Sequence, residues 1–401
     1  MKRKSFCLAV LLFISMSCFA QQSSCCGTSS SKIFERSVFS KGDVTRLQHV
    51  FAKAARKEPI VVSVIGGSIT EGAAASKTEN RYGNRIHKWW QEKFPQTEIK
   101  FVNASIGATG SDIGAHRVKA HLLSYEPDFV VIEFAVNDDI NKKIAETMEG
   151  LVRQILSSGK KPAVMLLFMM DIKGVSTQAQ HVVIGKHYDL PMISFKDAFW
   201  PEIQAGKIKW DEIEKDSVHP NDKGHEYAAK FITSYLESVL KETNVDGKLP
   251  AIKSKLPKPK TANMFERTEF ITSQTRVAFK SSGFSTDVKS SIYRGFFGNG
   301  WFSNKPGSIL EFEVDGTDLG IIYHHVKGDS GIVEISVDGG EPVKIDSYFA
   351  SDWGGGFAKW WLIAEGLDPG LHRVSIKLLE EKNKKSGGNN FRLMALTAAG
   401  Q

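Results

Sequence analysis

The stretch Ile60–Gly72, IVVSVIGGSITEG in one-letter code, decides the fold. Residues 60–65 are mostly β-branched and apolar, which is typical of a parallel-sheet strand that is buried on both faces. Two glycines follow, and glycine lets the backbone turn sharply at a strand end without a Cβ clash. Ser68 is thereby placed at the carboxyl edge of a sheet, where open α/β folds bind their ligands. A strand followed by an ordinary turn explains the stretch as well, so its meaning depends on the rest of the chain.

Strand-like and helix-like segments alternate over residues 59–241. Strands are expected at 60–65, 99–102, 129–134 and 163–169, and helices at 44–56, 84–93, 113–123, 141–157, 175–188 and 222–240. Repeated β-α units of this length predict a parallel sheet with helices on both faces. We therefore expect an α/β domain here.

The composition changes after residue 241. Residues 242–262 are rich in lysine and proline, which predicts a solvated, extended linker. Residues 263–401 then show short runs of alternating polar and apolar residues, for example 308–314 and 331–337, with turn signals between them. This pattern predicts an all-β, antiparallel sandwich domain.

The N-terminus has the features of an export signal. Residues 1–20 combine a basic head, a short apolar run and small residues before a predicted cut after Ala20. The apolar run is too short to span a bilayer, and no later segment resembles a transmembrane helix. We expect a periplasmic or secreted protein, free rather than lipidated at Cys18, because Ser15 stands where leucine is usual. Residues 21–58 are then an N-terminal lead-in.

Bulk composition narrows the possible partners. The chain of 401 residues has 41% hydrophobic and 24% charged residues and a formal charge of +7. Three bases and no acids lie in the first twenty residues, which leaves 7 − 3 = +4 for the rest. No stretch combines dense Lys and Arg with aromatic residues, so nucleic acid is not an expected partner. All four cysteines precede residue 27, so we expect neither disulfides nor thiol chemistry in the folded body.

Four polar pieces stand at or just beyond expected strand and helix ends: Ser68, the turn at Gly107, Asn137, and the pair Asp216 and His219. A serine hydroxyl is a weak nucleophile until a base removes its proton. Histidine suits this task because its pKa lies near neutrality, and a carboxylate is needed to orient the imidazole. Asp216 and His219 supply both groups from one short loop.

A negative charge that forms on a carbonyl oxygen needs fixed hydrogen-bond donors. The backbone N–H groups of Ser68 and of the Gly107 turn, with the Asn137 side-chain amide, would supply three. Each piece has an ordinary explanation as well, such as a surface histidine, a helix cap or a tight turn. Their order, each at the end of an expected element, is what indicates catalysis.

Four blocks, Gly66–Thr70, Asn103–Gly107, Ala135–Asp138 and Asp216–Asn221, resemble the conserved blocks of the SGNH (GDSL-type) hydrolases. The resemblance covers about residues 59–240. It implies a flavodoxin-like three-layer fold and ester hydrolysis through an acyl-enzyme, with no cofactor. Carried over position by position, it implies Ser68 as nucleophile, His219 as base, Asp216 as its orienting carboxylate, and Ser68, Gly107 and Asn137 as oxyanion hole.

Three positions depart from the family pattern. Gly67 stands where aspartate is commonest beside the nucleophile, and Ala135 stands where glycine is usual. Many relatives have a second glycine that donates its N–H at the position of Ala108. Alanine keeps the N–H, so both Gly107 and Ala108 remain candidate donors. The motif also differs from the Gly-x-Ser-x-Gly elbow of lipases, because Thr70 replaces the last glycine.

Metal catalysis is not expected. His324 and His325 are adjacent, so their side chains would point to opposite faces of a strand. His116 and His121 are five residues apart, which is off a single helical face, and no His-Glu-x-x-His motif occurs.

The substrate is inferred from the resemblance. Export, an SGNH domain and an appended sandwich resemble secreted bacterial carbohydrate esterases that remove acetyl groups, which implies an acylated carbohydrate as substrate. Trp353, beside three glycines, is the best candidate for an exposed aromatic that stacks on a sugar. The alternatives are a lipid or thioester acylhydrolase of the same fold, and a carbohydrate-binding protein with a degenerate catalytic domain.

Overall fold

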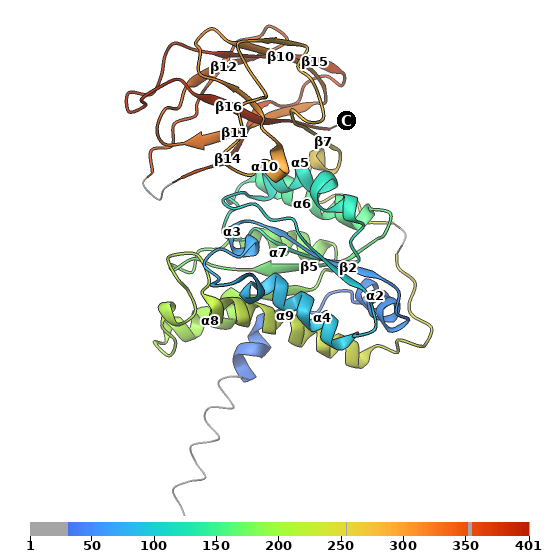
Figure 1. Ribbon diagram of the computed structural model, residues 1–401. Coiled ribbons are helices and arrows are strands. Elements are labelled where there is room, and N and C mark those ends of the chain that lie inside the picture. The colour runs from blue at the N-terminus through green and yellow to red at the C-terminus, as the bar shows by residue number, and fades with distance from the viewer. Residues whose placement is uncertain (1–30, 254, 352–354, 401) are drawn as a thin grey trace, which may run out of the picture.

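The computed structural model describes residues 31–253, 255–351 and 355–400, which form two domains stacked one on the other (Figure 1). The predicted signal peptide, the cysteines and Trp353 lie outside the described residues.

The first domain is built on a six-stranded sheet with the order β1-β6-β5-β4-β2-β3. All neighbouring strands are parallel except β1, which is antiparallel to β6. The strands are β1 (Val38–Ser40), β2 (Ile60–Gly66), β3 (Ile99–Asn103), β4 (Phe129–Glu133), β5 (Ala163–Phe168) and β6 (Met192–Ser194). The predicted α/β class is therefore confirmed, and the central strands β2, β4 and β5 are buried on both faces.

Alternate side chains of these strands feed two separate cores. Val131 belongs to one core, with α2 (Thr45–Ala55), α4 (Tyr82–Lys93), α8 (Phe195–Gln204) and α9 (Asp222–Glu242). Val130 and Ile132 belong to the other core, with α5 (Ser111–His121), α6 (Lys142–Ser157) and α7 (Gln178–His187). Because side chains alternate across a strand, the same apolar run supplies both cores.

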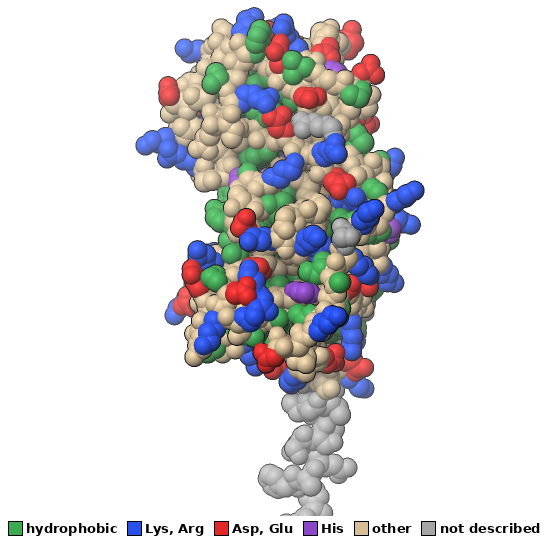
Figure 2. All heavy atoms as spheres, turned by 90° about the vertical axis from the view of Figure 1, so that its right-hand side faces the viewer, with side chains coloured by type: hydrophobic (Ala, Val, Ile, Leu, Met, Phe, Trp, Pro, Cys, Tyr) green, Lys and Arg blue, Asp and Glu red, His purple; other side chains and the backbone are tan. Residues whose placement is uncertain are grey.

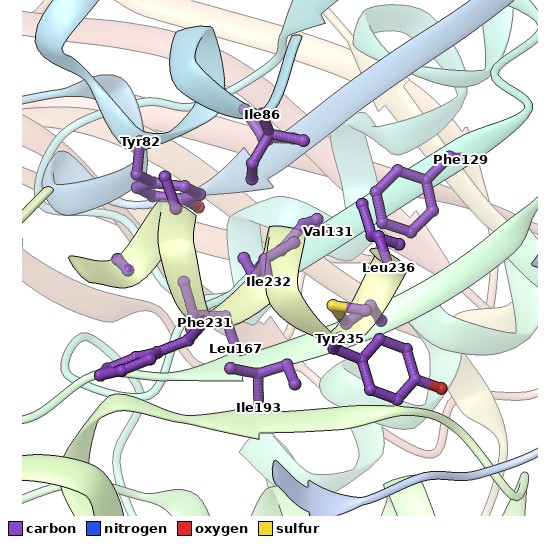
Figure 3. Packing of buried hydrophobic residues seen from close by; sticks show 14 of the residues in the cluster. Tyr82, Ile86, Phe129, Val131, Leu167, Ile193, Phe231, Ile232, Tyr235 and Leu236 are labelled. Atoms are coloured by element: carbon purple, nitrogen blue, oxygen red, sulfur yellow. The ribbon is translucent and has the colours of Figure 1, made fainter. Parts of the chain in front are cut away.

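The packing on the first face is seen in Figure 3. Ile232 and Leu236 project from α9 toward the sheet, where they lie near Val131 and Leu167. Ile193 of β6 closes the same cluster. Burying a side chain of this size contributes about 1.5–3 kcal/mol, so α9 is held by its apolar face.

The structure corrects the prediction that residues 21–58 are only an N-terminal lead-in. Residues 38–40 pair with β6 as the sheet's edge strand, and α2 is packed on the first core through Leu47, Val50 and Phe51. The α/β domain therefore starts before residue 59, because β1 pairs with the edge of β6 and α2 buries its apolar face in the first core.

Strand β6 and helix α8 were not predicted from the sequence. Strand β6 has three residues, and α8 follows it at once, with the Ser194 hydroxyl accepting a hydrogen bond from the Asp197 amide as N-cap. A three-residue strand is too short to show a period-two pattern, so only its pairing with β5 reveals it.

The second domain is the predicted antiparallel sandwich. One sheet has the order β13-β12-β15-β10-β8, and the other β14-β11-β16-β7 with β9 paired to β16. All of these strand pairs are antiparallel. The strands are β7 (Thr268–Ile271), β8 (Lys280–Ser282), β9 (Trp301–Ser303), β10 (Ile309–Asp315), β11 (Asp318–Val326), β12 (Ile332–Val337), β13 (Val343–Asp346), β14 (Gly356–Ala364), β15 (Leu371–Leu378) and β16 (Phe391–Ala399).

The linker is extended but bound to the first domain. The amides of Lys260 and Thr261 both donate to the Glu149 carboxylate at 2.6 Å, and Arg153 donates to the Pro257 carbonyl at 2.9 Å. Most of its residues remain exposed, but its backbone supplies the partners that buried polar groups of α6 need.

The sandwich sits on α5 and α6 (Figure 1). Phe265, Ile322 and Trp360 from the second domain belong to the same apolar cluster as α5 and α6. Lys143 of α6 adds ion pairs to Asp318 at 3.2 Å and to Glu365 at 3.0 Å. The two domains thus share one core across their contact.

Histidines outside the predicted site are mostly packing residues. His116 lies between the rings of Phe265 and Trp360, and burial lowers its pKa to about 3. His121 contacts Phe270 and Phe296 in the same way. Among the described residues there is no group of three or more His, Cys, Asp and Glu side chains that could hold a metal. Over the same residues, no helix has the length and apolar character needed to cross a bilayer.

Candidate active site

Ser68 lies where the sequence places it, at the carboxyl end of β2. The strand ends at Gly66, Gly67 caps the following turn, and Ser68 is the first residue of the short helix α3 (Ser68–Glu71). A Cβ on Gly67 would lie 2.0 Å from Asn137 Oδ1. A side chain at position 67 would therefore displace the Asn137 side chain from its present position.

His219 and Asp216 reach Ser68 from a loop that precedes α9. His219 Nε2 is 2.9 Å from Ser68 Oγ, and His219 Nδ1 is 2.8 Å from Asp216 Oδ2. This is the hydrogen-bonded arrangement that a serine nucleophile needs, because the hydroxyl faces a base and a carboxylate orients that base.

The loop is shaped by its own carboxylate. Asp216 Oδ1 accepts hydrogen bonds from the amides of Val218 and His219, both at 2.8 Å. Burial raises the pKa of Asp216, but the bonds from the His219 ring and from these two amides outweigh it and hold the pKa below its usual value. Trp210 donates its indole N–H to the Asp216 carbonyl at 2.6 Å. Asp216 thus stays ionised at neutral pH and fixes the backbone that carries His219.

The loop that carries Asn137 is held by two buried carboxyl groups. Glu133, at the end of β4, accepts from the Ala135 amide at 3.1 Å and from the Thr70 hydroxyl at 3.2 Å. Asp138 accepts from the Ser111 amide at 2.6 Å and pairs with His181 Nε2 at 2.9 Å. These bonds connect the Asn137 loop to α3, α5 and α7.

Burial raises the pKa of Glu133 to about 7, although bonds from Thr70 and Ala135 lower it. Sequence reasoning missed Glu133, Asp138 and His181. Glu133 and Asp138 lie beside or within the Asn137 block in sequence, but His181 is 43 residues beyond Asp138, so only the fold brings it to that carboxylate.

The Gly107 turn approaches Ser68 from the end of β3. A Cβ on Gly107 would lie 3.7 Å from Ser68 Cβ and 2.8 Å from Glu71 Oε2. The Glu71 carboxylate faces the Gly107 amide, and burial raises the pKa of Glu71 while this amide and two nearby arginines lower it. Within the described residues, the Ala108 amide has no acceptor, and Ala108 has a φ of 55°.

This geometry distinguishes the two candidate donors. The Gly107 N–H, which the family resemblance implied as oxyanion donor, already has a carboxylate partner. The next N–H along, from Ala108, is free to bind an oxyanion. The left-handed conformation of Ala108 explains why glycine is common at this position in relatives, since it is costly for residues with a Cβ.

Comparison with known proteins places this site in a family. The model of the GDSL-like lipase/acylhydrolase family matches residues 64–227, which span Ser68 and His219. A two-domain esterase (CEX) active on acetylated mannans has a similar crystal structure, with 33% sequence identity and a TM-score of 0.84. The match covers 92% of this chain and 98% of that esterase. This chain belongs to the GDSL-like lipase/acylhydrolase family. As a family member with this structural match, it is a carboxylic ester hydrolase.

Two further observations place this GDSL-like hydrolase among its relatives. The same CEX esterase was also crystallised with mannopentaose. Thioesterase 1/protease 1/lysophospholipase L1 of Escherichia coli (strain K12) is 25% identical over 185 residues, which are 44% of this chain and 83% of the relative. The likeness to CEX therefore includes both domains, whereas the likeness to the E. coli enzyme covers less than half of this chain.

Proposed function

We propose that this chain is an exported serine esterase that removes acetyl groups from a polysaccharide or oligosaccharide. The single observation that carries the serine mechanism is the unbroken chain of contacts from Ser68 through His219 to Asp216, at 2.9 and 2.8 Å.

The proposed reaction has two halves. His219 takes the Ser68 proton while Oγ attacks the ester carbonyl, and the tetrahedral intermediate then releases the sugar hydroxyl, which receives that proton. A water molecule, activated by His219, attacks the acetyl-enzyme and yields acetate and free Ser68. Asp216 stabilises the charged imidazole in both halves.

The oxyanion is proposed to be held by the amides of Ser68 and Ala108 and by the Asn137 side chain. Ala108 is preferred to Gly107 in this role because the Gly107 amide faces the Glu71 carboxylate. Such donors act in a fixed geometry and cost no reorganisation during the reaction.

An acetylated glycan is favoured over a lipid or a thioester as substrate. The relative that matches both domains is active on acetylated mannans. An apolar cavity of about 100 Å³ lies at the amino-terminal edge of β4 and β5, below Leu190 and Leu256. Ser68 stands at the carboxyl edge of the same sheet, so this cavity does not receive an acyl chain bound to Ser68.

The proposed export rests on residues 1–20 alone. Export suits a polysaccharide substrate, since large glycans lie outside the cytoplasm. Expression of the whole chain, followed by sequencing of the mature N-terminus, tests it, and a start at Gln21 is expected.

The experiment that tests the activity compares p-nitrophenyl acetate, p-nitrophenyl octanoate and acetylated glucomannan, with residues 21–401 as enzyme. We expect p-nitrophenyl acetate and acetylated glucomannan to be hydrolysed, and p-nitrophenyl octanoate to be hydrolysed only slowly. Ser68→Ala is expected to lower kcat by at least about 10³-fold, because the nucleophile is lost. Ser281→Ala, at an exposed serine of β8, is the matched control.

The outcomes separate the alternatives. Turnover that persists in Ser68→Ala at the wild-type rate would contradict the serine mechanism. Faster hydrolysis of p-nitrophenyl octanoate than of p-nitrophenyl acetate would favour a lipid acylhydrolase.

A further inference from the structure

We propose that Tyr293, in the β-sandwich domain, is a positioning residue of this esterase: its hydroxyl fixes the Gly107 carbonyl and thereby aims the Ala108 amide at the oxyanion. The inference rests on the proposed function, because it concerns the same Ser68 site. It makes the second domain part of the catalytic apparatus.

The contact itself crosses the domain boundary. Tyr293 Oη donates to the Gly107 carbonyl oxygen at 2.8 Å, over a sequence separation of 186 residues. A Cβ on Gly107 would lie 3.1 Å from the same hydroxyl and 3.7 Å from Ser68 Cβ. The hydroxyl therefore reaches the turn directly beside the nucleophile.

Peptide geometry carries this contact to the oxyanion donor. The Gly107 C=O and the Ala108 N–H belong to one planar peptide unit, in which they point in opposite directions. A hydrogen bond that fixes the carbonyl therefore fixes the direction of the N–H. On the preceding peptide, Glu71 holds the Gly107 amide. The turn is thus held on both sides of Gly107, by α3 of the first domain and by Tyr293 of the second.

Tyr293 and the residue that follows its acceptor, Ala108, both have an unusual backbone. Ala108 has a φ of 55° and Tyr293 a φ of 46°, in the left-handed region that is unfavourable for residues with a Cβ. Such conformations persist only where the surroundings enforce them, and they cluster at functional sites. Here the strained tyrosine donates to the turn that carries the strained alanine.

Tyr293 is anchored on the first domain by the residues that follow it. Its carbonyl accepts from the amides of Phe296 and Phe297 at 2.8 and 3.1 Å, which form the turn of α10 (Arg294–Phe297). The Phe296 ring lies 5.8 Å from the Arg117 guanidinium and 5.0 Å from the His121 ring, both on α5. Arg117 in turn donates to the Ala104 carbonyl, just before the Gly107 turn.

The hydroxyl remains a donor over the working pH range. Burial, with a smaller contribution from the Glu71 carboxylate, raises the pKa of Tyr293 to about 12. A role in proton transfer is therefore not expected, and the removal of the hydroxyl should leave the pH profile of kcat/KM in place.

The test uses Tyr293→Phe in the two-domain chain from Gln21, which removes one oxygen and keeps the ring. With p-nitrophenyl acetate we expect kcat to fall about tenfold, less than the ~10²-fold or more for a deleted oxyanion donor, while KM is unchanged. Phenylboronic acid, which forms a tetrahedral adduct on the serine, should bind more weakly by a similar factor. The pH profile should not move.

The matched control is Tyr323→Phe, because Tyr323 belongs to the core between the two sandwich sheets. It should leave kcat and boronate affinity at wild-type values. Thermal melting of both variants checks that each is folded at the assay temperature.

The outcomes are separable from those of the proposed function. If the wild type hydrolyses the ester in a Ser68-dependent way and Tyr293→Phe keeps its kcat and boronate affinity, the positioning role is wrong. If Tyr293→Phe raises KM alone, the hydroxyl contacts substrate and the proposal is likewise wrong. If the wild type shows no Ser68-dependent hydrolysis, the proposed function itself fails.

Discussion

Gly67 shows how a missing side chain shapes the site at the residue scale. Aspartate is commonest at this position in the family, but here Asn137 Oδ1 lies where a Cβ would stand. Gly67, which replaces the common aspartate, therefore leaves the space that the Asn137 side chain fills, and the positions of the two residues depend on each other.

Gly67→Asp, which restores the common family residue, is expected to lower kcat by about 10²-fold, because Asn137 must leave the position in which we propose that it binds the oxyanion. The measurement is p-nitrophenyl acetate hydrolysis with a melting curve. Gly159→Ala is the control, since a Cβ there meets nothing within 4 Å. Full activity of Gly67→Asp would show that Asn137 is not needed in its present position.

The loop that joins Ile213 to α9 illustrates the element scale. Its exposed side carries Asp216 and His219, while Glu214 points inward, is 3% exposed and has no hydrogen-bond partner on either carboxyl oxygen among the described residues. Burial, with a contribution from the nearby Asp216 charge, raises the pKa of Glu214 to about 9. The loop therefore folds with this carboxyl protonated at neutral pH.

Glu214 should make stability depend on pH. A carboxyl whose pKa is higher in the folded state binds more protons there, so stability falls as pH rises from about 4.5 to about 9. Glu214→Gln removes the ionisable group and keeps its shape. We expect this variant to match the wild type at pH 5 and to exceed its free energy of unfolding at pH 8.5 by about 1–3 kcal/mol.

The check is chemical denaturation at both pH values. Glu212→Gln is the control, because this neighbouring carboxyl is exposed. Equal pH dependence in Glu214→Gln and wild type would mean that Glu214 ionises normally in the folded chain.

The shared core joins the two domains at the scale of the whole molecule. Trp360 of β14 faces α5, 9% exposed, and donates its indole N–H to Thr397 at 3.0 Å, whereas its neighbour Trp361 is 43% exposed. Figure 2 shows basic and acidic side chains interspersed over one face of both domains. Apolar burial thus continues from the α/β domain into the sandwich across their contact.

Trp360→Ala is expected to destabilise the chain by about 3–5 kcal/mol, because it opens a cavity in the shared core. In calorimetry, the wild type should unfold in one transition and Trp360→Ala in two, as the domains lose their coupling. Trp361→Ala, on the opposite face of the same strand, should stay within about 1 kcal/mol of wild type. Two transitions in the wild type would contradict a shared core.

The sequence alone was enough for the α/β class of the first part of the chain, the antiparallel sandwich of the second, and the placing of Ser68, Asp216 and His219 at element ends. These features depend on local patterns: period-two and period-3.6 burial, glycine at a strand end, and polar residues just beyond strand ends. The pairing of β1 with β6 and the bound linker escaped prediction, because each depends on partners more than 100 residues away.

Tertiary structure alone decided which amide of the Gly107 turn is free and what holds that turn. The sequence left Gly107 and Ala108 open, because both have an N–H. The fold brings the Glu71 carboxylate to one amide and the Tyr293 hydroxyl to the adjoining carbonyl. No local pattern marks these contacts, since the direction of a peptide plane is set by the partners that the whole chain brings to it.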